Sequence, residues 1–221
     1  MQVRRKELTD FKNELLAMAS HAEGAVVRAV KALIERNDDL AAQVKYDDDV
    51  LNHFEIRIDE LALFLLSQAP LASDLRFITV GMKITSDLER IGDESAKIAK
   101  CTLALNKEPA LKDFVDIPSM ADRAIEMLRE ALDAFVLGDT DKARNVLPKD
   151  ELVNQLNSQV HRELAGYIAE SASNISRSLN LMIVSKSLER VADHAKNIAE
   201  EAVFLHEGRD IRHSSGRSQA S

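Results

Sequence analysis

The sequence predicts an all-α fold of two tandem three-helix bundles that are related by an internal repeat. Turn-forming residues are scarce, apolar residues recur at helical spacing, and two blocks of sequence return about 100 positions later. Gly and Pro number 7 and 4, about 5 % of the 221 residues against roughly 12 % in an average chain. Because β-sandwiches and barrels need many turns rich in Gly and Pro, the composition argues against both.

The first helix is expected over residues 11–34, where apolar residues fall three to five positions apart. Thr9 or Asp10 would cap its beginning, since both side chains accept hydrogen bonds from free backbone N–H groups. Residues 37–39, Asn-Asp-Asp, interrupt the pattern. They would end this helix and cap the next one.

A second helix is expected over residues 40–65, ended by Pro70. Its apolar residues follow steps of 4, 7, 3, 4, 3 and 4, which form a heptad seam. The third helix is expected from about residue 72 to 105. The seam of the second helix consists of Leu40, Val44, Leu51, Phe54, Ile58, Leu61 and Leu65.

The second half is expected to contain three more helices after a linker. Residues 106–119 include Pro109 and Pro118 and lack helical periodicity. The helices would span residues 120–137, from Asp139 or Asp150 to residue 172, and residues 175–204, with a turn at Gly138. The predicted organisation is a first repeat at 8–105, a linker at 106–119, a second repeat at 120–212 and a disordered tail at 213–221.

The internal repeat rests on two blocks that recur in the same order. Residues 86–100 and 186–200 are identical at six of fifteen positions, at an offset of 100. Residues 48–54 align with residues 150–156 at an offset of 102. A nearly constant offset between two pairs of blocks indicates two copies of one three-helix unit.

Composition also limits the class of protein. The net charge of −8 argues against nucleic-acid binding, because phosphate backbones require a positive surface. Cys101 is the single cysteine, so an internal disulfide is excluded, as suits a reducing compartment. The longest apolar run, residues 61–66, is far shorter than the ~20 residues of a membrane span. With no apolar stretch after the charged N-terminus, no signal peptide is predicted, and we expect a cytoplasmic protein without direct membrane insertion.

Acidic side chains line the predicted helices beside their apolar seams. Glu89 with Asp93, and Glu189 with Asp193, are four residues apart and therefore stack on one helix face. Like charges at this spacing cost a few tenths of a kcal/mol, and a bound cation would remove the repulsion. Oxygen ligands favour Mg²⁺, Ca²⁺, Mn²⁺ or iron. A third stripe, on the second helix, consists of Asp48, Asn52, Glu55 and Asp59, of which Glu55 and Asp59 would converge with Glu89 and Asp93.

Two other interpretations of these stripes stay open. They are also compatible with solvated helix faces, on which Arg90 and Arg190 pair with Asp93 and Asp193. A metal-dependent enzyme inside a helical bundle is the second alternative, and full burial with convergence of Glu89 and Glu189 would favour it. A ferritin-type di-iron site is not indicated, because no His follows a Glu by three positions.

Several short motifs stand at matching places in the two halves and at the end of the chain. Residues 68–76 (QAPLASDLR) are followed by residues 88–93 (LERIGD), and later come residues 188–193 (LERVAD) and 208–213 (GRDIRH). In this order, they resemble the first repeat, the second repeat and the usual ending of the PhoU family, accessory proteins of bacterial phosphate signalling. The resemblance covers about residues 8–213.

The resemblance implies two three-helix bundles and a role as a non-enzymatic negative regulator of the response to phosphate starvation. It implies contact with the ATPase subunit of the phosphate ABC transporter and with a sensor histidine kinase. Exposed heptad-like seams also suggest a homodimer. The family's metal-binding patches would match Glu55 with Asp59 and Glu89 with Asp93, for an ion such as Mg, Mn, Fe or Zn.

The second repeat departs from this pattern. There the matching residues are Glu189 and Asp193, facing Asp150 and Asn154. Asn157 and His161 stand at the positions of Glu55 and Asp59. With fewer negative ligands, weaker or different metal binding is expected in the second repeat. The remaining alternative is a metal-free helical scaffold.

Overall fold

The computed structural model describes residues 2–111 and 116–212 and contains, in this part of the chain, helices but no strands. The predicted tail, 213–221, and the middle of the predicted linker, 112–115, lie outside the described residues. The helices are α1 (Gln2–Glu35), α2 (Asp38–Ser67), α3 (Ala72–Leu105), α4 (Asp116–Leu137), α5 (Thr140–Val146), α6 (Lys149–Glu170) and α7 (Ile175–Glu207), with a 3₁₀ turn η1 (Ala172–Asn174) before α7.

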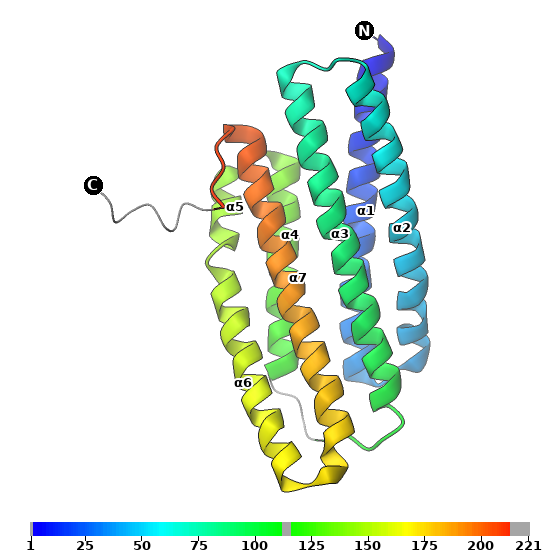
Figure 1. Ribbon diagram of the computed structural model, residues 1–221, viewed down its shortest axis with the longest axis vertical. Coiled ribbons are helices and arrows are strands. Elements are labelled where there is room, and N and C mark those ends of the chain that lie inside the picture. Colours follow the sequence, from blue (N-terminus) through cyan, green and yellow to red (C-terminus); the bar gives the residue numbers. More distant parts are fainter. Residues whose placement is uncertain (1, 112–115, 213–221) are drawn as a thin grey trace, which may run out of the picture.

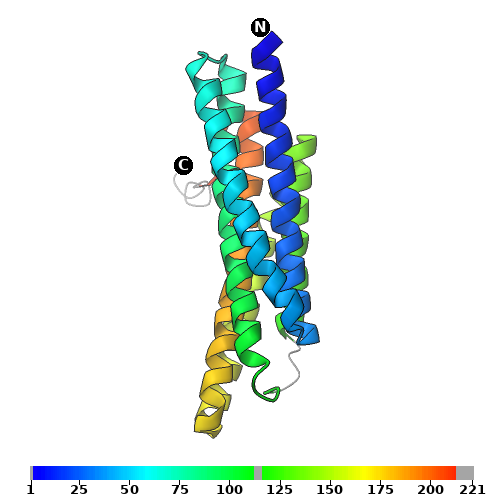
Figure 2. The same cartoon turned by 90° about the vertical axis from the view of Figure 1, so that its right-hand side faces the viewer.

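The helices form the two predicted bundles, which are elongated and lie side by side (Figure 1). One bundle contains α1, α2 and α3, and the other contains α4, α6 and α7 with the short α5 at one end. The two bundles meet chiefly where α3 packs antiparallel against α7, and α1 also contacts α4. Figure 2 shows α1 beside α4, whereas, among the described helices, α2 packs only on α1 and α3 of its own bundle.

Local sequence explains several helix ends. The Asn37 side chain caps α2 by accepting a hydrogen bond from the backbone N–H of Leu40, at 3.0 Å, which confirms the predicted cap. Helix α7 ends at Gly208, whose left-handed conformation (φ 67°) suits glycine. Helix α1 differs from the prediction, because it is already helical at Gln2 and Thr9 and Asp10 lie inside it. No Gly or Pro between residues 2 and 10 stops the helix earlier.

The second half has one more helix than predicted. Asp139 caps the short α5, and Asp150 lies in the first turn of the separate α6, so the two predicted starting points belong to different helices. Helix α4 begins at Asp116, inside the segment predicted as linker, and buries Ile117. Pro118 is tolerated there, because backbone N–H groups in the first turn have no intrahelical acceptor.

A continuous apolar core runs through both bundles. Gly81 of α3 lets α1 approach closely, since an added Cβ would lie 2.5 Å from Cε1 of the buried Phe11. The Phe11 ring packs edge-on against Phe77, which in turn stacks on Phe135 of the second bundle, with ring centroids 6.3 Å apart. Within the described residues, no helix has the length and apolar character needed to cross a membrane.

Candidate functional site

Helices α2 and α3 bring four carboxylates together, which we call the first acidic cluster; it consists of Asp48, Glu55, Glu89 and Asp93. The helices approach closely at Gly92, where an added Cβ would lie 2.5 Å from Cδ1 of Leu51 and 3.6 Å from Oδ1 of Asp48. Burial raises the pKa of Glu89, and the negative charges of Asp93, Glu55 and Asp48 raise it further against the opposing effect of Arg90. Burial and the charges of Asp93 and Asp49 likewise raise the pKa of Asp48. The cluster therefore favours a bound positive charge.

The first acidic cluster includes one residue beyond the predicted set. Asp48, one of the stripe residues that had been given no ligand role, lies near Asp93. Asp59 is partly buried and lies about one turn beyond Glu55 on α2. The register between α2 and α3, which the periodicity of one helix does not encode, brings Asp48 to the cluster.

Arg90 lies at the rim of the first acidic cluster. It forms ion pairs with Glu89 and Asp93, with N–O distances of 3.4 and 3.3 Å, so the predicted Arg90–Asp93 pair is present. Because the Arg90 side chain is 59 % exposed, these pairs neutralise the cluster only weakly. The corresponding prediction for Arg190 is wrong: its side chain turns away to Glu94 of the first repeat, 3.0 Å away, where that buried carboxylate attracts it.

Helices α6 and α7 form the second acidic cluster, which consists of Asp150, Asn154, Glu189 and Asp193. Asp150 is buried, and its Oδ2 accepts hydrogen bonds from Lys196 Nζ at 3.0 Å and Asn154 Nδ2 at 3.3 Å. Burial raises the pKa of Asp193, and the charges of Asp150 and Glu189 raise it further. Lys186 forms an ion pair with Glu189. Neither lysine was predicted as a functional residue, although the aligned repeats place Lys186 opposite Ser86 and Lys196 opposite Ala96.

The two clusters contain the oxygen donors that hard cations prefer, but their side chains are not arranged as a coordination site. Among the described residues, no three His, Cys, Asp or Glu side chains stand in an arrangement ready to hold a metal ion. Their donors are oxygens, which suit Mg²⁺ or Mn²⁺. Glu89 and Glu189 stay 17 % and 13 % exposed, so neither side chain is fully enclosed. These glutamates also belong to different clusters, which is not the buried convergence that would favour an enzyme.

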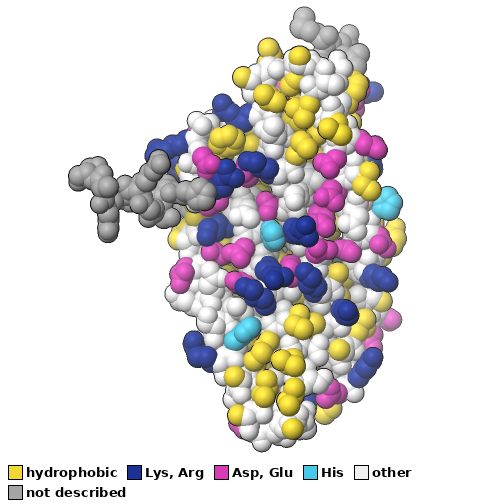
Figure 3. All heavy atoms as spheres, in the orientation of Figure 1, with side chains coloured by type: hydrophobic (Ala, Val, Ile, Leu, Met, Phe, Trp, Pro, Cys, Tyr) yellow, Lys and Arg dark blue, Asp and Glu magenta, His cyan; other side chains and the backbone are white. Residues whose placement is uncertain are grey.

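Between the two clusters, α3 and α7 form a polar pocket of about 460 Å³. Glu94 accepts hydrogen bonds there from Lys97 at 2.8 Å and from Arg190 at 3.0 Å. Burial alone would raise the pKa of Glu94, but hydrogen bonds from Lys97, Ser187 and Arg190 outweigh it and lower the pKa. Figure 3 shows the resulting band of charged side chains across the middle of this face, with apolar side chains towards both ends.

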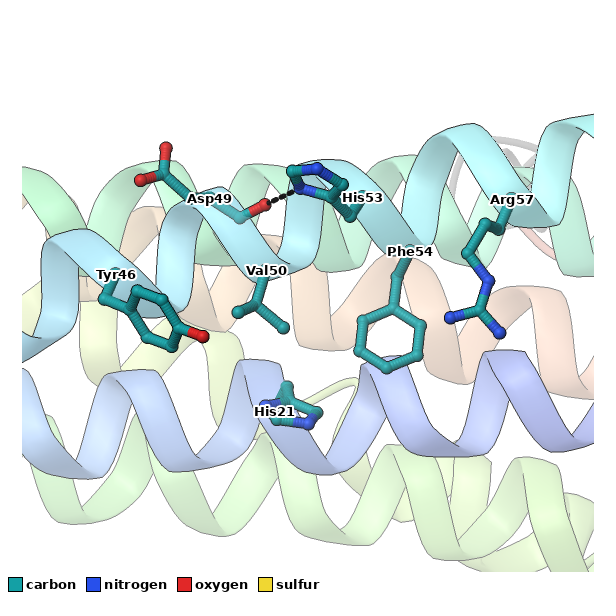
Figure 4. Close-up of a pocket in the computed structure, with 7 residues that line it drawn as sticks. All are labelled: His21, Tyr46, Asp49, Val50, His53, Phe54 and Arg57. Carbon is teal, nitrogen blue, oxygen red and sulfur yellow. Dashed lines mark hydrogen bonds between the residues drawn. The ribbon is translucent and has the colours of Figure 1, made fainter.

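A second pocket, of about 370 Å³, lies between α1 and α2 and is drawn in Figure 4. Nδ1 of His53 lies 2.6 Å from the backbone oxygen of Asp49, whose carboxylate points away from the pocket. His21 packs on Phe54, with ring centroids 5.3 Å apart. The pocket therefore presents an aromatic wall rather than converging ligands.

Comparison with known proteins gives consistent matches over both halves. A family model described as PhoU domain matches residues 15–102 and 117–202. The chain is 41 % identical to a phosphate-specific transport system accessory protein PhoU homolog of Pseudomonas aeruginosa, covering 94 % of this chain and 86 % of the relative. It is 38 % identical to the homolog of that name from Aquifex aeolicus, with coverages of 94 % and 95 %.

Solved structures agree with the fold. The crystal structure of PhoU from Pseudomonas aeruginosa superposes with a TM-score of 0.90 at 40 % identity, over 93 % of this chain and 99 % of that one. The phosphate transport system regulatory protein PhoU from Streptococcus pneumoniae gives a TM-score of 0.86 at 28 % identity, with coverages of 94 % and 99 %. These matches confirm the predicted duplicated helical fold.

Proposed function

Because the chain belongs to the PhoU family, we propose that it is a negative regulator of phosphate uptake and of phosphate-starvation signalling. It acts in the cytoplasm, by protein contact rather than by catalysis. The observation that carries the proposal is the double domain match, together with relatives that are named as accessory proteins of the phosphate-specific transport system. The proposed partners are the ATPase subunit of the phosphate transporter and a sensor histidine kinase.

The surface of the second bundle supports a role in protein contact. Ile175, Leu179 and Ile183 are exposed at intervals of four residues and form an apolar stripe on α7. Contiguous apolar side chains on a surface are typical of interaction sites. The proposal includes a homodimer, for which this stripe is the candidate contact surface.

Affinity capture tests the proposed partners. Tagged full-length chain would be recovered from phosphate-replete cells, with Leu179→Ser as the surface variant and Leu152→Ser, an exposed leucine on α6, as the matched control. We expect the transporter ATPase and a histidine kinase with the wild type and the control, and less of both with Leu179→Ser. Recovery of neither protein would contradict the proposed function.

We also propose that the first acidic cluster binds a divalent or trivalent ion such as Mg, Mn, Fe or Zn. Glu89 and Asp93 are held on one rigid helix, and the raised pKa of Glu89 shows that negative charge is costly there. An ion would offset this repulsion and leave coordination positions open to a partner carboxylate or to phosphate. The chain's net charge of −8 makes phosphate binding without a metal unfavourable.

Metal analysis tests this second proposal. The protein would be dialysed and its metal content measured by mass spectrometry, for the wild type and for Glu89→Gln/Asp93→Asn. Glu60→Gln, on the exposed side of α2, is the control. We expect only the double variant to lose its metal. An equal metal content in all three proteins would contradict metal binding at the first acidic cluster.

A further inference from the structure

The aligned repeats differ in two basic residues beside the acidic clusters. Lys186 and Lys196 of the second repeat stand where the first repeat has Ser86 and Ala96. We propose that these lysines are tethered cations that take the place of a metal ion in the second acidic cluster, so that the chain binds its metal in the first repeat alone. The inference rests on the proposed metal binding and specifies where that binding occurs.

Lys196 occupies the position that a cation would take. Its ammonium lies 3.0 Å from Oδ2 of Asp150, whose side chain is only 8 % exposed. A buried carboxylate without a positive partner is strongly unfavourable, and this partner is supplied by the chain itself. In the first repeat the equivalent Asp48 faces Asp93 and Asp49, and Ala96 offers no charge.

Lys186 and the two substituted residues, Asn157 and His161, also make the second acidic cluster less suited to a metal ion than the first. Lys186 forms an ion pair with Glu189. Asn157, at the position of Glu55, accepts a hydrogen bond from Ser185 Oγ at 2.6 Å. Nε2 of His161, at the position of Asp59, lies 3.3 Å from the backbone oxygen of Met182, so it is not directed at the cluster.

The charge balance of the clusters follows from these residues. The first acidic cluster has four carboxylates against one guanidinium, that of the largely exposed Arg90. The second has three carboxylates against two ammonium groups. An incoming divalent cation is therefore attracted more strongly to the first cluster, and in the second it must displace an ammonium group from a buried carboxylate.

Removing the lysines should create a metal site. Oδ1 of Asp150 and Oδ1 of Asn154 are buried and accept no hydrogen bond from any described residue. Both oxygens belong to the second acidic cluster and are acceptable ligands for Mn²⁺. Without both lysines, these two oxygens would face an uncompensated negative cluster, and Oδ2 of Asp150 would keep only its hydrogen bond from Asn154. The second repeat would then resemble the first in charge.

Mn²⁺ titration followed by electron paramagnetic resonance tests the inference. We expect one tight Mn²⁺ per wild-type chain, two in Lys186→Ser/Lys196→Ala, and two in the milder Lys186→Ser/Lys196→Gln, which keeps a hydrogen-bond donor for Asp150. Lys12→Ala/Lys31→Ala, which removes two exposed lysines from α1, controls for net charge and should stay at one. Circular dichroism verifies that each variant is folded.

The outcomes separate this inference from the proposal on which it rests. Two equal sites in the wild type, or a single site in both folded lysine variants, would overturn the inference and leave metal binding intact. Loss of the wild-type site in Glu189→Gln rather than in Glu89→Gln would also overturn it. No binding in any protein would overturn the proposed metal binding itself.

Discussion

Gly81→Ala tests the close approach of α1 and α3 that organises the first bundle. The new methyl group would lie 2.5 Å from Cε1 and 2.6 Å from Cζ of Phe11, where atoms cannot coexist without movement. Phe11 is fully buried and is held by Phe77, which also stacks on Phe135 of the second bundle. The ring therefore has little freedom to move, and the contact between bundles is disturbed if it does.

The magnitude follows from two opposing effects. Overpacking a well-filled core costs about 1–3 kcal/mol, and the rigid setting of Phe11 places this site at the upper end. Replacing a helical Gly by Ala returns about 1 kcal/mol of helix propensity. We expect a net loss of about 1–2 kcal/mol in the free energy of unfolding, or roughly 2–8 °C in melting temperature for a chain of this size.

Urea unfolding, followed by circular dichroism, measures this effect as a lower midpoint at an unchanged slope. Gly166→Ala is the matched control, because Gly166 lies in α6 with no atom within 4 Å of an added Cβ. It should stabilise the protein by about 0.5–1 kcal/mol. If Gly81→Ala were as stable as this control, the reasoning from the α1–α3 approach would be refuted.

Two further predictions concern charge. The lowered pKa of Glu94 means that its hydrogen bonds with Lys97 and Arg190 stabilise the fold above its ordinary pKa of about 4.5 and are lost as the pH falls below that value. Urea midpoints between about pH 6 and 3 should therefore fall more steeply for the wild type than for Glu94→Gln, and parallel curves would contradict this. Glu89 has a raised pKa, so its ionised form destabilises the metal-free protein at neutral pH. With a chelator present, Glu89→Gln should stabilise the protein by a few tenths of a kcal/mol, whereas added Mn²⁺ should raise the melting temperature of the wild type more; a destabilised metal-free variant would count against the repulsion from Asp93.

Much of the fold was predictable, because apolar periodicity and the internal repeat are properties of the chain itself. The cap at Asn37 and the end of α2 before Pro70 followed from local chemistry. The separate α5 was not predicted, since seven residues are too few to show helical periodicity. The early start of α4 was hidden by Pro118, which breaks a helix interior but fits its first turn.

The acidic clusters were predictable as pairs on one helix but not as sets across helices. The spacing of Glu89 and Asp93 places both on one face of α3. Which residue of α2 lies opposite depends on the register set by Leu51 against Gly92, and this brings in Asp48, which the spacing on α2 alone did not single out. For the same reason, contacts between helices such as that of Lys196 with Asp150 become visible only in the folded chain.

Anomalous diffraction from crystals soaked in Mn²⁺ tests the central claim most directly, because it locates the ion without any variant. We predict a peak between α2 and α3, within coordination distance of the Glu89 and Asp93 carboxylates. No peak at that place, or a stronger peak beside Asp150 and Asp193, would contradict the account.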